Sequence, residues 1–148
     1  MDFVVSTYNK SMKYTLKNEL PAPEEYCHLR QITGLSPKTI AAAQVSLPRS
    51  LHAVTLRNGD QLIAMGRVIG DLGCHVQIVD IAVHPDYQGL KLSRVIMENI
   101  MDFVTKECHR CAFVNLFADV DYLYQKFGFV DSVKSKGMYL DWNRVSQS

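Results

Sequence analysis

The sequence predicts a layered α/β (α+β) domain in which a mixed, mostly antiparallel central sheet carries helices on both faces. Two observations predict this fold class. Three β-branched segments follow one another between residues 51 and 84, and segments with helical periodicity lie both before and after them. The 148 residues, of which 47% are hydrophobic and 21% charged, suffice for one hydrophobic core. We therefore expect a single domain over residues 1–148.

The first third of the chain predicts a strand and two short helices. Residues 14–20 are expected to form the strand, which a Pro-Ala-Pro sequence ends. Glu24-Glu25 then favours a helix N-terminus, and Gly34 ends that helix. Ser36-Pro37 is typical of an N-cap followed by proline at the first helical position, so a second helix is expected over residues 37–45.

The middle of the chain predicts a three-stranded antiparallel meander. Residues 51–57 and 61–69 flank Asn58-Gly59, which is a strong signal for a tight hairpin because both residues tolerate positive φ. A second turn at residues 70–73 leads into a third strand over residues 75–84. These three strands are expected to form the centre of the sheet.

The segment after Pro85 predicts a helix, a buried strand and a second helix. One helical stripe of apolar residues predicts the first helix, namely Leu92, Val95, Ile96, Ile100 and Phe103. Residues 112–117 are expected to form the strand. Either Asp119 or Asp121 is expected to cap the next helix, which Gly128 ends in a left-handed conformation.

The two ends of the chain give weaker patterns. Residues 1–12 show no clear period and are either a frayed end or a short edge strand. Residues 129–133 and 138–142 are rich in apolar and aromatic side chains, and we expect them to form a closing hairpin.

Composition argues against several functional classes. The net charge of +1 gives no indication of binding to nucleic acid or to an anionic membrane. No apolar run approaches the ~18 residues of a membrane helix, and the N-terminus lacks the pattern of an export signal, so a cytoplasmic location is expected. Cys108 and Cys111 have a C-x2-C spacing, but no second ligand pair follows, so we expect no metal site and reduced, partly buried thiols.

The most informative stretch is residues 79–93, where a β-branched run ends at a proline and a Gln-Gly turn leads into a helix. The first turn of a helix carries unpaired N–H groups and a partial positive charge, so a pyrophosphate can bind there. Lys91 and Arg94 add positive charge nearby. The alternative is a plain connection between strand and helix with two solvated cations.

Residues 79–93 and 123–129, in this order and at this distance, resemble the acyl-coenzyme A loop and the tyrosine helix of the GCN5-related N-acetyltransferases (GNAT). The family has a loop pattern Arg/Gln-x-x-Gly-x-Gly/Ala. Gln88 matches it and Ser93 is small, but Lys91 replaces the central glycine, which puts the tightness of cofactor binding in question. The resemblance implies acetyl-CoA as acyl donor. The residues that it places at the cofactor are Ile81, Ala82, Val83, Gln88, Gly89, Leu90, Lys91, Leu92, Ser93, Arg94 and Asn115. For Asn115, a hydrogen bond within the core is an equal alternative.

The second motif, Leu123-Tyr-Gln-Lys-Phe-Gly-Phe129, resembles the family pattern closely and implies a catalytic residue. In that family the tyrosine faces the thioester sulfur and protonates the leaving thiolate, and Tyr124 takes this position. The amine attacks the acetyl group directly, so no covalent enzyme intermediate is required. The alternative for Tyr124 is a purely structural role, as a core tyrosine whose hydroxyl lies at the rim of the core.

Asp80 is the candidate general base, and a structural carboxylate is the alternative. Regular strand alternation places Gln77 and Val79 on one face of the sheet and Asp80 with Ala82 on the other. Arg67 is an unusual charge within a strand, so it is expected either to pair with Asp71 or Asp80 or to hold an anionic acceptor. Tyr26 and Arg30 are further candidate acceptor contacts.

The resulting functional hypothesis is an acyl-CoA-dependent N-acetyltransferase that acts on a primary amine of a small molecule. Two alternatives remain open. A non-catalytic acyl-CoA-binding module is made credible by Lys91, and an enzyme that acetylates a protein or peptide amine is disfavoured by the lack of an acidic run. Neither the acceptor amine nor the presence of a homodimer follows from the sequence.

Overall fold

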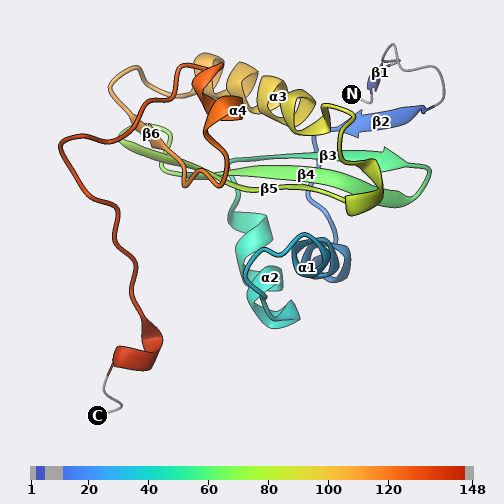
Figure 1. Ribbon diagram of the computed structural model, residues 1–148, viewed down its shortest axis with the longest axis horizontal. Coiled ribbons are helices and arrows are strands. Elements are labelled where there is room, and N and C mark those ends of the chain that lie inside the picture. Colours follow the sequence, from blue (N-terminus) through green and yellow to red (C-terminus); the bar gives the residue numbers. More distant parts are fainter. Residues whose placement is uncertain (1–2, 6–11, 146–148) are drawn as a thin grey trace.

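The computed structural model describes residues 3–5 and 12–145 and places one sheet between two layers of helices (Figure 1). The strands are β1 (Phe3–Val5), β2 (Tyr14–Lys17), β3 (His52–Asn58), β4 (Gln61–Gly70), β5 (His75–Val83) and β6 (Phe113–Asn115). The helices are α1 (Pro23–Ile32), α2 (Ile40–Ser46), α3 (Leu92–Glu107) and α4 (Asp121–Gln125), with 3-10 turns η1 (Leu47–Arg49), η2 (Pro85–Tyr87) and η3 (Trp142–Arg144). The predicted fold class is confirmed.

The strands lie in the sheet in chain order, from β1 to β6. Neighbours from β1 to β5 are antiparallel, whereas β5 and β6 are parallel because α3 carries the chain back across the sheet. The predicted meander is β3–β4–β5, and Gly59 takes a φ of +59° in its first hairpin. The edge strand expected within residues 1–12 is present as β1, and the rest of that segment lies outside the described residues except for Met12.

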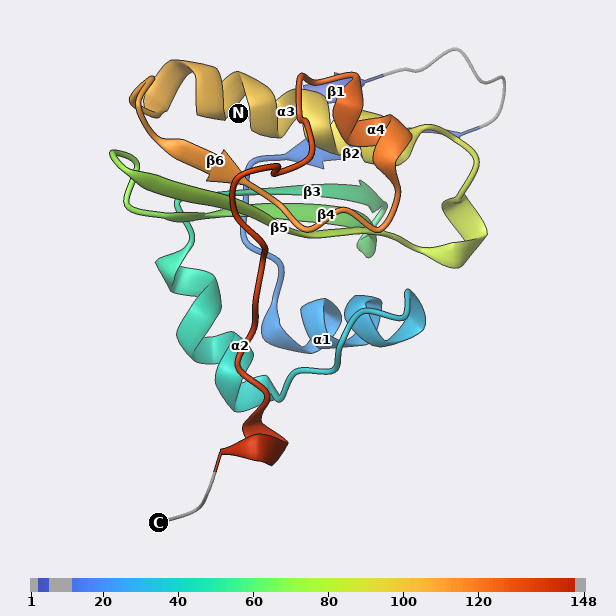
Figure 2. The same cartoon turned by 60° about the vertical axis from the view of Figure 1, so that its left-hand side comes forward.

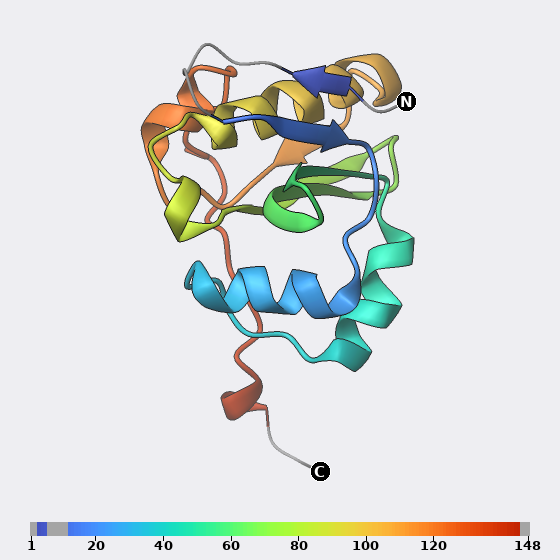
Figure 3. The ribbon, with the colours of Figure 1, turned by 90° about the vertical axis from the view of Figure 1, so that its right-hand side faces the viewer.

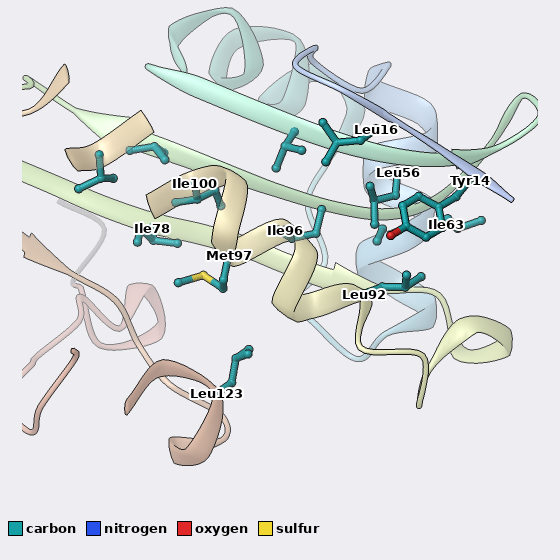
Figure 4. Packing of buried hydrophobic residues seen from close by; sticks show 14 of the residues in the cluster. Tyr14, Leu16, Leu56, Ile63, Ile78, Leu92, Ile96, Met97, Ile100 and Leu123 are labelled. Atoms are coloured by element: carbon teal, nitrogen blue, oxygen red, sulfur yellow. The ribbon is translucent and has the colours of Figure 1, made fainter. Parts of the chain in front are cut away.

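The two faces of the sheet bury separate clusters. Helices α3 and α4 cover one face, where Ile96, Met97 and Ile100 are fully buried against the sheet (Figure 4). Helices α1 and α2 cover the opposite face around Leu29 and Met65 (Figure 3). Each helix therefore presents one apolar stripe to the sheet, as its sequence period indicates.

Two predicted helix starts are wrong. Helix α2 begins at Ile40 because the Thr39 hydroxyl caps it by accepting from the Ala42 N–H at 3.1 Å. Ser36 instead accepts hydrogen bonds from Arg30, so tertiary contacts use the residue that looked like a cap. Neither Asp119 nor Asp121 caps α4, whose N-cap is Val120 without a side-chain hydrogen bond.

The predicted hairpin over residues 129–142 is also wrong. Within residues 116–145, the described chain contains no strand, and its last part runs away from the sheet toward the side of α1 and α2 (Figures 1 and 2). Its apolar side chains remain exposed, among them Val133, Met138 and Leu140. A strand pattern forms a strand only where a neighbouring strand supplies hydrogen bonds, and this segment has none within the described chain.

The described residues contain no helix long and apolar enough to cross a membrane. All four cysteines are free. Cys27 and Cys108 are half-buried and Cys74 and Cys111 are exposed, so only two match the expectation of partly buried thiols. Burial raises the pKa of the Cys108 thiol.

Side chains of α3 pack closely over Gly66 of β4. A Cβ atom there would lie 2.6 Å from Ile96 Cγ2 and 2.8 Å from the Cδ1 atoms of Ile100 and Ile81. Gly66→Ala is expected to lower the free energy of unfolding by about 1–3 kcal/mol, because three packed side chains must move. Urea denaturation measures the change. Gly73→Ala is the control, since its new methyl would have only one neighbour, at 4.0 Å; equal losses in the two variants would contradict the close contact.

Candidate active site

The C-terminal half of β5 has a free edge. Strand β6 pairs with β5 only over His75–Gln77, and beyond Gln77 no strand in the described chain lies on this side of β5. The His84 N–H donates to the Ile63 carbonyl of β4 at 2.8 Å. Because successive N–H groups alternate sides along a strand, those of Val83 and Ile81 face the free edge.

A β-bulge interrupts β5 at the start of this edge. Gly66 alone on β4 lies opposite both Asp80 and Ile81, since the register shifts between Met65 and Arg67. Asp80 takes a φ of +61°, a left-handed conformation that aspartate tolerates better than most residues. The bulge thus explains why an aspartate stands inside a β-branched run.

The bulge also reverses the predicted division of β5 side chains. Ile78 packs in the cluster under α3, whereas Ala82 packs in the cluster under α1 and α2, although regular alternation would place both on one face. Gln77 and Val79, which alternate with Ile78, therefore lie on the same face as Asp80. The prediction that they lie on opposite faces is wrong because strand alternation restarts after the extra residue.

Asp80 is held by three donors. Its carboxylate accepts from the Tyr26 hydroxyl at 2.8 Å, from Arg67 Nε at 2.8 Å and from Arg30 Nη1. The side chains of Arg30, Arg67 and Asp80 are each less than a tenth exposed. Of the two expected pairings, Arg67 therefore uses Asp80, and Asp71 accepts backbone N–H groups of its own turn instead.

Both arginines are largely engaged by protein acceptors. Arg30 also donates through Nε and Nη2 to the Ser36 carbonyl, and Arg67 Nη1 donates to the Ser50 hydroxyl at 2.8 Å. Burial raises the pKa of the Tyr26 phenol, and the charge of Asp80 raises it further. The group is therefore a connected network of two cations, one carboxylate and one neutral phenol.

The loop before α3 is left-handed at two positions. Gly89 has a φ of +80° and Lys91, the N-cap of α3, a φ of +60°. Lys91 thus stands in a conformation that glycine adopts without strain, at the position where the sequence pattern has glycine. No side chain caps the helix and its first turn holds no acid, so its N–H groups are available to an anion.

The side chains of other loop residues already have contacts within the protein. Leu92 is buried and Leu90 packs against the same cluster, so only their main-chain groups could meet a ligand. Arg94 pairs with Glu98 at 2.9 Å on the surface, which offsets its charge. The Gln88 amide donates to the Val83 carbonyl at 3.3 Å and so joins the loop to the end of β5.

Tyr124 borders two hollows. The α1–α2 hollow, of about 700 Å³, is bounded by α1, α2, β4, β5 and residues 116–119, and it includes Asp80, Ile81 and Tyr139. The α3–α4 hollow, of about 650 Å³, lies on the other side of Tyr124 and includes Asn115. Tyr124 is the aromatic hydroxyl common to both.

The environment of Tyr124 keeps its phenol protonated. Burial raises the pKa of Tyr124, and the negative charge of Asp119 adds to the rise. Its ring packs edge-on against Phe129 with centroids 6.4 Å apart. Within residues 3–5 and 12–145 its hydroxyl has no hydrogen-bond partner, so it is free to donate to a bound molecule. The Asn115 amide, in contrast, donates to the Val76 carbonyl at 3.3 Å, as its alternative assignment expects.

Comparison with known proteins identifies the family. The profile of the Acetyltransferase (GNAT) domain matches residues 48–131, which span β3 to the segment after α4. The chain belongs to the GNAT acetyltransferase family. The matched residues include both predicted motifs, the loop before α3 and the tyrosine helix.

Individual GNAT relatives agree with this placement. The chain is 33% identical over 113 residues to the uncharacterized N-acetyltransferase ycf52 of Porphyra purpurea, covering 72% of this chain but only 64% of that protein. A crystal structure of a protein of unknown function from meticillin-resistant Staphylococcus aureus, described as a probable acetyltransferase, is 45% identical, with a TM-score of 0.83 over 87% of this chain and 99% of that one. A GNAT family protein from Streptococcus pneumoniae shares the fold, at 22% identity and a TM-score of 0.71 over 91% and 99% of the two chains.

Some site residues could not be found from the GNAT motifs. Ser36 and Ser50 support the two arginines, and Tyr139 reaches the α1–α2 hollow from a segment predicted to be a hairpin. Their sequence signals are a serine before a proline, a serine in a loop and a tyrosine in an apolar run. None of these signals is specific for an active site.

Lys91 provides a test of loop geometry in this GNAT chain. The Lys91→Gly variant is expected to be more stable than Lys91→Ala, with a free energy of unfolding about 1 kcal/mol higher. Both variants lose the charge, but only glycine adopts the left-handed backbone at this position without strain. Urea denaturation compares the two. Equal stabilities would show that position 91 does not require positive φ in solution.

Proposed function

We propose that this protein transfers an acetyl group from acetyl-CoA to a primary amine of a small molecule. One observation carries the proposal: Tyr124 and the strand edge at Ile81 border the same hollow, which α1 and α2 enclose from the other side. One place therefore combines a proton donor, main-chain groups that could bind a thioester, and space for an acceptor.

The donor would bind along the free edge of β5. The N–H groups at the start of α3 suit a pyrophosphate, and the main-chain groups of Ile81 and Val83 suit the amide-containing pantetheine arm. Bound acetyl-CoA would supply an activated acyl thioester. Gln88 already occupies the Val83 carbonyl, which leaves the Val83 N–H and both main-chain groups of Ile81 for the ligand.

Tyr124 would act as general acid. Its phenol is protonated at neutral pH, half-buried and without a partner among the described residues, so it can donate a proton to the departing sulfur. The amine nitrogen attacks the acetyl carbonyl and the carbon–sulfur bond then breaks, so no covalent adduct with a protein side chain is needed. The proton that the nitrogen loses passes to solvent water and balances the proton that Tyr124 gives to the sulfur.

Asp80 would position the site rather than act as its base. Three donors occupy its carboxylate, and two of them are guanidinium groups, so neither carboxylate oxygen is open to the amine. Its network joins α1 to β4 and β5 and thereby fixes the floor of the α1–α2 hollow. A hollow of about 700 Å³ between two helices has the size of a small-molecule pocket, which favours such an acceptor over a protein chain.

Calorimetric titration with acetyl-CoA tests the donor site. Ser93→Asp should weaken binding at least tenfold, because a new carboxylate in the first turn of α3 repels the pyrophosphate. The same carboxylate is favourable for the helix itself, so loss of folding would not explain the result. Ser135→Asp adds the same charge outside the loop and should bind normally. No detectable binding by the native chain would overturn the proposal.

Release of free thiol with panels of small amines and peptides tests the reaction. Release with small amines supports the proposed acceptor class. Release with peptides alone would replace it by protein acetylation, and tight binding of acetyl-CoA without release would identify a binding module.

A further inference from the structure

The α1–α2 hollow has more cationic than anionic side chains in its wall. Arg30, Lys38 and Arg67 line it together with the carboxylates of Asp80 and Asp119. The formal charge of the hollow is therefore positive, and a positive cleft attracts small anions. Whether it can also hold an anion depends on which of these donors the protein itself leaves unused.

Arg30 uses all three nitrogens of its guanidinium group within the protein. Nε and Nη2 donate to the Ser36 carbonyl at 3.0 and 2.7 Å, and Nη1 donates to Asp80. Arg30 therefore belongs to the support of Asp80 and leaves little donor capacity for a ligand.

Arg67 has one guanidinium nitrogen to spare. Nε donates to Asp80 and Nη1 to the Ser50 hydroxyl, both at 2.8 Å, whereas Nη2 has no acceptor within residues 3–5 and 12–145. Nη2 is not sealed in the core, because in that part of the chain the Tyr14 hydroxyl is the one fully buried polar side-chain atom without a partner. The Arg67 side chain is only 8% exposed and lines the hollow, so Nη2 opens into the hollow. A charged donor in so buried a position favours a hydrogen-bond acceptor.

The charges of the hollow are divided between its two sides. Asp119 lies beside Tyr124, since its negative charge contributes to the raised pKa of that phenol, and a carboxylate there attracts the ammonium form of an amine. Arg67 lies on β4, across β5 from this point. On its own side the exposed Lys38, which has no ion pair among the described residues, adds positive charge. The hollow thus suits a molecule with an amine at one end and an anion at the other.

We propose that the acceptor is a primary amine that also carries an anionic group, a carboxylate or a phosphate ester, which Arg67 binds through Nη2. This substrate class rests on the proposed acetyl transfer, because the amine is the group that is acetylated. Arg67 stands opposite Val79 of β5, so a short linker joins its guanidinium to the thioester position at Ile81. A guanidinium group suits either oxyanion because its planar donors are directed. Asp80 fixes that plane through Nε, which gives the buried network a part in acceptor binding.

Matched pairs of amines test the anionic group. In the thiol-release assay, β-alanine and γ-aminobutyrate are compared with their amides, and phosphoethanolamine is compared with ethanolamine. We expect kcat/KM to be at least tenfold higher for the anionic member of a pair, through a lower KM. The pair with the largest ratio tells carboxylate from phosphate. Equal values for both members of every pair, or a preference for the uncharged members, would overturn the proposal.

Charge variants identify the binding group. Arg67→Lys keeps the positive charge, but an ammonium group cannot hold Asp80, Ser50 and a ligand in one plane, so the ratio of kcat/KM between anionic and uncharged amine should fall at least tenfold. Lys38→Glu changes an exposed residue, where folding is not at risk, and should lower the same ratio about threefold or more. Lys13→Glu is the matched control, exposed and outside both hollows, and should keep the native ratio. Partial loss of folding would reduce the rates for both amines of a pair and leave their ratio unchanged. A native ratio in both Arg67→Lys and Lys38→Glu would show that Arg67 does not hold the anion.

Direct titration separates anion binding from acetyl transfer. Calorimetry of the native chain in the presence of CoA, which has no acetyl group to transfer, compares phosphoethanolamine and γ-aminobutyrate with their uncharged counterparts. The better anionic amine should bind at least tenfold more tightly than its counterpart, and Arg67→Lys should remove the difference. Such binding without thiol release from acetyl-CoA would support the anion site while the proposed transfer fails. Thiol release with no difference in binding would leave the transfer standing and overturn the anion site.

Discussion

Tyr124→Phe is expected to lower kcat by about 10²-fold or more, with little change in the KM for acetyl-CoA. The substitution removes only the hydroxyl, and general acid catalysis typically contributes at least this factor. The ring keeps its contact with Phe129, so the fold and both hollows should persist. Thiol release under saturating acetyl-CoA measures the effect.

The pH profile gives this prediction a second readout. Since burial raises the pKa of Tyr124, the native enzyme should keep its proton donor until the pH exceeds the ordinary range of a tyrosine near 10. A fall in kcat at still higher pH should therefore appear in the native chain and be absent in Tyr124→Phe. Tyr122→Phe is the matched control on the same helix, because Tyr122 is 68% exposed and borders neither hollow. Equal rates for native chain and Tyr124→Phe would remove Tyr124 from the mechanism.

Local chemistry explains which features the sequence predicted. Asn58-Gly59 specifies its turn because few residues accept positive φ, and the stripe of α3 specifies a buried face because apolar burial follows the helical period. The loop and tyrosine motifs were found in another way, through their resemblance to the patterns of the GNAT family.

Contacts between distant residues explain what the sequence could not predict. The bulge at Asp80 depends on β4, α1 and β5 meeting at one point, and regular alternation along β5 gave the wrong face for Gln77 and Val79. Ser36 has the local pattern of a helix cap, but Arg30 uses it. Residues 129–142 have a strand pattern, but no strand of the described chain pairs with them, so periodicity alone predicted a hairpin that does not form.

Asp80→Asn is expected to lower the free energy of unfolding by about 3–5 kcal/mol, the usual loss when one partner of a buried ion pair is removed. Asparagine keeps the size of the side chain and accepts a left-handed backbone, so the φ of +61° adds little to the change. What remains is two buried guanidinium groups, Arg30 and Arg67, facing a neutral amide. Urea denaturation measures the loss, and Asp86→Asn, with an exposed side chain, should change stability by less than about 0.5 kcal/mol.

Two further measurements separate the possible roles of Asp80. If its charge holds the two arginines, Arg67→Gln in the Asp80→Asn background should cost less stability than in the native chain, because one unpaired cation is removed with it. A positioning role also predicts that folded Asp80→Asn keeps the native dependence of kcat on pH while its KM for the acceptor rises. A general base predicts the opposite: kcat falls and the rise of activity with pH disappears. Because the carboxylate already accepts from Tyr26 and both arginines, we expect the first pattern, with the network acting through the bulge at the start of the free edge of β5.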